Sequence, residues 1–282
     1  MEPLVNIKMD LQRKCYREMY DYMEGRQADF HSRQDNAQHV LFNSGRIGPF
    51  VIVKGEIKML TRKICPPFFE IGPKSYLYGD QVLELAIAAD AAAKRYDVDV
   101  IFTTPYTEIR RVRESTDRIF VFAPHMDPLQ VGRGLSDILP EAVKAAGADG
   151  VMLNHCERPL TLSALRQTIL RAKGLDLLTI VCADSIAEAR AVAELHPDII
   201  VAEPTDLIGT GKASSMDYVL ASIEEVKRVD KDILVLQGAG ISNGQDVYNV
   251  IFAGADATGS SSGIVKAASS TAMIDEMLFA VR

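Results

Sequence analysis

The sequence predicts an α/β fold, a (β/α)8 barrel that follows an N-terminal extension. From Pro66 onward, short apolar runs alternate with amphipathic stretches of helical period, which is the pattern of repeated βα units around parallel strands. This pattern fits either a doubly wound sheet or a barrel. The residues that suit chemistry all follow predicted strands, at what would be the carboxyl-terminal face of a barrel, and this favours the barrel.

Seven strands are clear and an eighth is weaker. We predict the seven at residues 68–71, 98–103, 118–122, 150–153, 178–183, 199–202 and 232–236. The eighth is expected around residues 256–260, where Ala257-Thr258-Gly259-Ser260 lacks the bulky apolar residues that usually fill a barrel interior. Amphipathic stretches predict helices at residues 81–94, 138–146, 161–172, 186–195, 216–229 and 244–252.

The first part of the chain has a different character. Residues 9–25 are polar and aromatic and could form one amphipathic helix, and residues 49–53 could form a short strand. We find no chemistry there. We therefore divide the chain into an extension of unknown role, residues 1–60, and a barrel domain, residues 61–282. The extension is either an accessory arm or the product of an upstream start codon, with Met59 as the true initiator.

Composition excludes several classes of protein. The 282 residues carry a formal charge of −7 and an isoelectric point near 5.3, which argues against nucleic acid or an anionic membrane as a main partner. No apolar run approaches the roughly 20 residues of a membrane-spanning helix, and no signal peptide is recognisable. The four cysteines show no C-x-x-C spacing, which is typical of reduced thiols and predicts a cytoplasmic protein.

The stretch with the clearest chemistry follows the sixth predicted strand. An apolar run ends on Glu203, Pro204 follows directly, and a short loop closes with Gly209-Thr210-Gly211. A carboxylate at the tip of a buried strand, beside a loop with exposable backbone N–H groups, suits proton abstraction from a small anionic substrate. A lone glutamate here would by default only cap the turn, but the Gly-Thr-Gly at this spacing favours the functional interpretation.

This loop resembles the mobile active-site loop of the triosephosphate isomerase family, E-P-x-x-x-I-G-T-G, in the form of its shorter, archaeal-type branch. The resemblance runs from about Pro66 to Arg282. It implies a TIM barrel and a cofactor-independent aldose–ketose isomerase. That enzyme interconverts D-glyceraldehyde 3-phosphate and dihydroxyacetone phosphate through an enediol, and Glu203 moves the proton. Residues 61–282 would then be the isomerase domain.

Two further motifs supply the other catalytic residues that the resemblance implies. Asn154-His155-Cys156-Glu157-Arg158 resembles the family's [G/N]-H-S-E-R, so that His155 is the neutral imidazole that polarises the carbonyl. Glu157 orients Lys74 or His155 by hydrogen bonding. Gly72-Pro73-Lys74 stands where the family has Asn-x-Lys, and Lys74 neutralises charge on the substrate.

The last two strands are followed by small residues. Residues 238–242 match the archaeal-type G-A-G-I-S, and residues 259–266 end like the family's S-G-V-V-K. There, backbone N–H groups and a helix N-terminus can close on a phosphate. The implied phosphate-binding residues are Gly209, Gly240, Ser242, Ser261 and Ser262.

Two other kinds of site were weighed. Gly238-Ala239-Gly240 hints at a dinucleotide loop, but the third glycine and a ribose-binding acid are missing. His125 and Asp127, together with His155 and Glu157, could suggest a metal site. However, residues 123–128, which contain His125 and Asp127, resemble a structural A-Q-H-x-D-P segment of the family. We therefore expect neither a cofactor nor a metal.

The sequence departs from the family at two linked positions. Gly72 replaces the asparagine, and Leu135 replaces the threonine that supports the Asn-x-Lys segment of a neighbouring subunit. Their loss implies a rebuilt contact within an expected homodimer or homotetramer. It also leaves open an isomerase of another short sugar phosphate, such as a tetrose or tetrulose phosphate. A non-catalytic phosphate-binding barrel is a third possibility.

Overall fold

The structure is a computed structural model, and it describes residues 40–44, 47–53, 56–59, 63–208, 210 and 214–282. The helix predicted at residues 9–25 and the loop glycine Gly209 lie outside the described residues. The chain divides into two compact units, and the larger contains Thr61–Arg282 together with Ser44–Gly48. The assignment of residues 1–60 as an accessory extension and of residues 61–282 as an isomerase domain stays a prediction.

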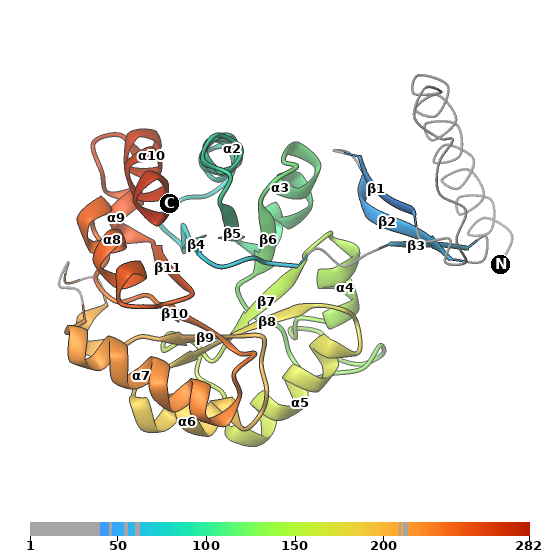
Figure 1. The fold of residues 1–282 in the computed structure, drawn as a ribbon. Coiled ribbons are helices and arrows are strands. Elements are labelled where there is room, and N and C mark those ends of the chain that lie inside the picture. The colour runs from blue at the N-terminus through green and yellow to red at the C-terminus, as the bar shows by residue number, and fades with distance from the viewer. Residues whose placement is uncertain (1–39, 45–46, 54–55, 60–62, 209, 211–213) are drawn as a thin grey trace, which may run out of the picture. The chain divides into compact units, whose positions relative to one another are not determined.

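A small sheet precedes the barrel in the sequence. It consists of β1 (Val40–Ser44), β2 (Ile47–Val53) and β3 (Glu56–Met59), in that order (Figure 1). β2 and β3 pair antiparallel, with Phe50 opposite Met59. The short strand predicted at residues 49–53 is confirmed as part of β2.

Eight parallel strands close into a barrel, as predicted (Figure 1). They are β4 (Phe68–Ile71), β5 (Asp99–Thr103), β6 (Phe120–Ala123), β7 (Gly150–Leu153), β8 (Leu178–Ala183), β9 (Ile199–Ala202), β10 (Leu234–Gln237) and β11 (Ala257–Ser260). The weak eighth strand is confirmed as β11. It closes the barrel by pairing with β4, so that Gly259 lies opposite Glu70.

Helices surround the strands (Figure 1). They are α2 (Asp80–Tyr96), α3 (Ile109–Ser115), α4 (Pro140–Ala145), α5 (Leu162–Lys173), α6 (Ile186–Ala193), α7 (Met216–Val229), α8 (Gly244–Phe252), α9 (Ser262–Val265) and α10 (Ser270–Val281). All six predicted helices are present, and α3, α9 and α10 are additional. Side chains that accept a backbone N–H cap several amino-terminal ends: Thr161, Ser185, Ser215, Asn243 and Ser269.

The apolar core has two layers because successive side chains of a strand point to opposite faces. Phe69 and Ile71 of β4 pack in the outer layer with the helices. Phe68 points into the barrel, where it packs with large side chains from neighbouring strands, including Ile101 and Phe122. The alternation places Glu70 on the inner face too, one pleat nearer the carboxyl-terminal end.

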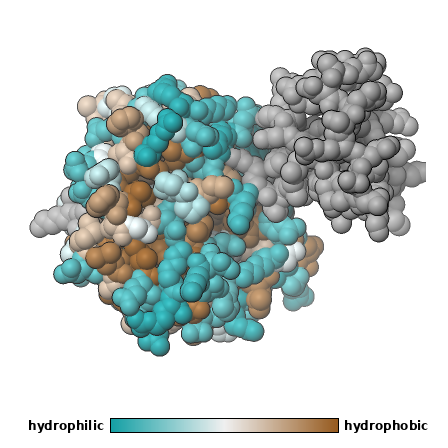
Figure 2. Space-filling model, in the orientation of Figure 1, coloured by the Kyte–Doolittle hydropathy of each residue, from teal (hydrophilic) through white to brown (hydrophobic). Residues whose placement is uncertain are grey.

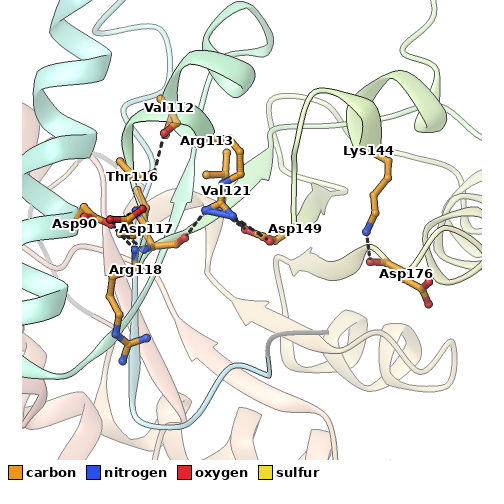
Figure 3. A network of polar contacts seen from close by, with 11 residues as sticks. Asp90, Val112, Arg113, Thr116, Asp117, Arg118, Val121, Lys144, Asp149 and Asp176 are labelled. Atoms are coloured by element: carbon orange, nitrogen blue, oxygen red, sulfur yellow. Dashed lines mark hydrogen bonds and ion pairs between the residues drawn. The ribbon is translucent and has the colours of Figure 1, made fainter. Parts of the chain in front are cut away.

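Carboxylates secure the opposite end of the barrel, where the strands begin (Figure 3). Asp90 of α2 accepts backbone N–H groups from Asp117, Arg118 and Ile119, which precede β6. Asp149 precedes β7 and accepts the Val121 N–H at 2.8 Å, while it also pairs with Arg113. These contacts give carboxylate acceptors to backbone N–H groups before and within β6.

The surface is mixed in character. Hydrophilic residues cover much of the face seen in Figure 2, with apolar side chains gathered in patches between them. Within the described ranges, no helix is long and apolar enough to span a membrane.

Candidate active site

A cavity of about 640 Å³ opens where the barrel strands end. Its walls come from the segments that follow β4, β5, β6, β7, β9, β10 and β11. All predicted site residues that the structure describes line this cavity: Lys74, His155, Glu157, Glu203, Gly240, Ser242, Ser261 and Ser262. Because the carboxyl ends of parallel strands meet at one face of a barrel, side chains far apart in the sequence come together there.

Glu203 follows β9 and is held in place by its own backbone. Its N–H donates to the carbonyl of Ala183 at 3.0 Å, and Pro204 and a short 3-10 turn, Thr205–Leu207, carry the chain away from the strand. Burial raises the pKa of the Glu203 carboxyl, partly offset by the charge of Lys74. Raising the pKa makes the carboxylate a stronger base.

Lys74 reaches the cavity from an unusual backbone conformation. Its φ is 48°, in the left-handed region that residues other than glycine seldom adopt. Its Nζ lies 3.1 Å from Glu157 Oε1. Burial lowers the pKa of Lys74, but the hydrogen bond and charge of Glu157 and the charge of Glu203 outweigh it, so that the pKa lies above its ordinary value. The ammonium group therefore stays charged.

His155 is arranged as a neutral hydrogen-bond donor. Its Nδ1 accepts the backbone N–H of Glu157 at 3.2 Å, which leaves the ring proton on Nε2. Burial lowers the pKa of His155, and the positive charge of Lys74 lowers it further. Both effects favour the neutral imidazole.

Asn154 holds the loop that carries His155. It lies in the left-handed region with φ 57°, donates from Nδ2 to the Cys182 carbonyl at 3.0 Å, and accepts the Leu160 N–H at 2.9 Å. The side chain thus ties the segment after β7 to β8. This is a scaffold for His155 and Glu157.

The residues predicted to bind phosphate lie in the segments after β10 and β11. Gly240 has φ 72°, and the buried Oγ of Ser261 has no hydrogen-bonding partner within the described part of the chain. Ser242 is engaged elsewhere, because both its N–H and its hydroxyl donate to Asp246. Gly263 is closely packed, with an added Cβ lying 2.6 Å from Ser260 Oγ. Among the described residues on this side of the cavity, Ser261 therefore offers a buried hydroxyl that has no hydrogen-bonding partner.

The residues weighed as metal ligands have other partners. His125 Nε2 lies 3.1 Å from Asp127 Oδ1, and Asp127 Oδ2 accepts the Ile138 N–H at 2.7 Å. Arg158 is also near Asp127 Oδ1, at 3.9 Å. These contacts suit a structural role for the segment after β6.

Comparisons with known proteins agree with this geometry. The family model described as triosephosphate isomerase matches residues 73–277. The triosephosphate isomerase of Sulfurisphaera tokodaii is 34% identical over 218 residues, which are 76% of this chain and 94% of that protein. That of Methanocaldococcus jannaschii is 35% identical over 203 residues (71% and 92%), and that of Caldivirga maquilingensis is 37% identical over 216 residues (75% and 96%).

This chain belongs to the triosephosphate isomerase family. Lys74, His155 and Glu203, which we predicted from the sequence as catalytic groups, all line the cavity. Leu135, which stands in place of the family's threonine, is fully exposed in the long segment between β6 and α4. Val131 of the same segment is also exposed.

The other departure from the family, Gly72, borders a residue that sequence reasoning missed. Glu70 lies on the inner face of β4, is 9% exposed and lines the cavity. A Cβ at position 72 would lie 3.1 Å from Glu70 Oε1, so this carboxyl fills part of the space beside Gly72. The period-two alternation of residues 68–71 contained the signal, since it places Glu70 inside with Phe68.

Proposed function

We propose that this chain interconverts D-glyceraldehyde 3-phosphate and dihydroxyacetone phosphate through an enediol. The observation that carries the proposal is the convergence of Glu203, His155 and Lys74 on one cavity. Membership of the triosephosphate isomerase family supports the same reaction. The reaction moves protons within one molecule, so it needs no external oxidant or reductant.

The residues divide the proton transfers between them. Glu203 removes a proton from C1 of dihydroxyacetone phosphate, and the electron pair forms the C1–C2 double bond while the C2 oxygen takes the Nε2 proton of His155. His155 then recovers a proton from the C1 oxygen, and Glu203 returns its proton to C2. The aldehyde forms, and both side chains end as they began.

Lys74 supplies the electrostatic part of the mechanism. Negative charge develops on the substrate oxygens as the C–H proton leaves, and a fixed ammonium group in a partly buried cavity stabilises that charge. The 3.1 Å contact from Glu157 holds the Lys74 side chain. Glu157 is therefore a positioning residue for Lys74 and, through its backbone N–H, for His155.

The phosphate group belongs on the side of β10 and β11. We assign it to the backbone of Gly240 and to Ser261 and Ser262, with Ser261 Oγ, which has no partner among the described residues, as a donor. Gly209, predicted for the same role, lies outside the described residues. Ser242 contributes only if its hydroxyl leaves Asp246.

Assembly and location are parts of the same proposal. Exposed Leu135 and Val131 on the segment after β6 support a homo-oligomer, a dimer or a tetramer, that covers them. Cys65, Cys156 and Cys182 are free thiols, which supports a cytoplasmic location.

A panel assay tests the proposed function. Purified full-length protein is supplied with three-, four- and five-carbon aldose and ketose phosphates, and conversion in both directions is followed by coupled dehydrogenase reactions or NMR. The proposal predicts the highest kcat/KM for glyceraldehyde 3-phosphate. A higher value for a tetrose phosphate would assign the chain to the alternative substrate class, and no conversion of any compound would favour a binding barrel.

A further inference from the structure

We propose that Glu70 is a further catalytic residue, whose carboxyl donates a hydrogen bond from Oε2 to a carbonyl or enediol oxygen of the substrate. This role rests on the proposed isomerase function and adds to it. Glu70 has no counterpart in the motifs discussed above, and the mechanism built from Glu203, His155 and Lys74 leaves it unused.

The first argument is the placement of the carboxyl group. Glu70 is on the inner face of β4 and lines the cavity together with Lys74. Its Oε1 accepts the hydroxyl of Thr103 at 2.6 Å. Among the described residues, Thr103 bonds to Oε1 alone, and Glu70 keeps 9% of its surface exposed where it lines the cavity. One oxygen is thus anchored, and in our proposal the other is the one that meets the substrate.

The second argument is that two glycines make room for this group. A Cβ at position 72 would lie 3.1 Å from Oε1, and a Cβ at position 259 would lie 3.1 Å from Oε2 and 2.8 Å from the Glu70 carbonyl oxygen. Gly72, directly after β4, and Gly259, on the paired strand β11, therefore flank the carboxyl. A larger side chain at either glycine would meet Glu70, so both positions leave room for its carboxyl.

The third argument is electrostatic. Glu203 must be ionised to act as a base, and a second carboxylate on the same cavity would repel both it and the developing enediolate. Burial raises the pKa of Glu70 to about 7, with the charge of Glu203 adding to the rise and the Thr103 hydrogen bond and the Lys74 charge opposing it. The charge of Glu70 also contributes to raising the pKa of Cys182 in β8. The protonated form is a neutral donor, and it occupies space next to the position of the missing amide.

The charge states give the sign of the pH dependence. Below pH 7 Glu70 holds its proton and donates it to the substrate oxygen. As pH rises through the pKa of about 7 the donor becomes a repelling carboxylate, so that kcat/KM falls on the alkaline side. Losing one hydrogen bond to a charged oxygen costs about 10- to 100-fold in rate.

Three variants test the role. At pH 6.5 Glu70→Ala should lower kcat/KM by about 10- to 100-fold, whereas Glu70→Gln, which keeps a donor, should stay within about fivefold and lose the alkaline decline. Thr103→Val removes the hydrogen bond that lowers the pKa of Glu70, so its decline should move to higher pH. The matched control is Glu84→Gln on the exposed face of α2, whose profile should equal the wild-type profile.

The outcomes separate this inference from the proposed function. An alkaline decline that persists unchanged in Glu70→Gln would overturn the inference while leaving the isomerase intact. If the wild type isomerises no triose phosphate, binding of sn-glycerol 3-phosphate tests Glu70 alone, by the ratio of the Kd values of wild type and Glu70→Gln at each pH. Dividing the wild-type Kd by the Glu70→Gln Kd cancels the effect of phosphate ionisation, which is the same for both proteins. This quotient should rise above pH 7, and a constant quotient or undetectable binding would overturn the inference.

Discussion

Two sides of the same cavity follow the family pattern to different degrees. On the side of β7 and β9, the cavity holds His155, Glu157 and Glu203, which we predicted from motifs that resemble those of the family. On the side of β4, β5 and β11, the family's asparagine is replaced by Gly72. The space beside it holds Glu70, anchored by Thr103 and accommodated by Gly259.

The difference separates two tasks within one reaction. Proton transfer at carbon needs a base and a donor at fixed positions, and that side of the cavity is unaltered. Hydrogen bonding to the substrate oxygens needs only a neutral donor at the right place, and either an amide or a protonated carboxyl supplies one. The predictions below test whether the two sides are as distinct as this division requires.

The largest loss of activity is expected from a change on the side of β7 and β9. Glu203→Gln should bind phosphate ligands almost normally but lose about 10²- to 10⁴-fold or more in kcat, because an amide cannot accept the C–H proton. Steady-state kinetics with glyceraldehyde 3-phosphate measure this, and the exposed Glu194→Gln is the control. A Glu203→Gln variant that kept a tenth of the wild-type rate would remove Glu203 from the mechanism.

The next largest effect belongs to Lys74. Lys74→Met should cost about 10²- to 10³-fold in kcat, because one preorganised positive group is lost. Glu157→Gln should cost only about fivefold or less, because Glu157 is 65% exposed and its pair with Lys74 is screened by water. If the two variants were equally damaged, Glu157 would have a direct role in place of a positioning one.

On the rebuilt side, two substitutions should depend on one another. Gly72→Asn alone should lower kcat/KM by about tenfold, since the new side chain meets Glu70. Combined with Glu70→Ala it should recover activity, with a coupling energy of about 0.5–3 kcal/mol in a double-mutant cycle. The exposed Glu84→Gln on α2 is the control and should stay within about twofold. Additive effects would show that residues 70 and 72 do not share one space.

The smallest effect is expected from removing the extension. The family match covers residues 73–277, and the described site residues all follow residue 62. A protein that begins at Met59 should therefore fold and retain near-native kcat. Circular dichroism and the coupled assay would check this, and an insoluble or inactive truncation would make the extension part of the barrel or of its subunit contact.

Much of the barrel could be predicted because its elements have strong local patterns. The predicted bounds of β4, β7, β8 and β9 agree with the structure end to end, since each is a short, buried run. Helix α3 was missed because Ile109–Ser115 is short and polar, with only Ile109 and Val112 buried. Helix α10 was also missed, although Ile274, Met277, Leu278 and Val281 have helical spacing.

The candidate site could be predicted only in part, for a related reason. Residues that match a motif are recognisable one segment at a time, and the barrel then brings the segments together. The contact between Glu70 and Gly259 depends on the pairing of β11 with β4, which are far apart in the sequence. The sequence shows that the eighth strand lacks bulky apolar residues, but only its pairing with β4 shows that Gly259 lies beside Glu70.

Proton exchange with solvent tests the central claim most directly. The account predicts that dihydroxyacetone phosphate converted in D2O carries deuterium at carbon, because the proton taken by Glu203 can exchange before it returns. NMR of substrate and product during turnover would detect this, and Glu203→Gln should abolish incorporation. Turnover with no deuterium at carbon, or incorporation that survives in Glu203→Gln, would contradict an enediol formed by this base.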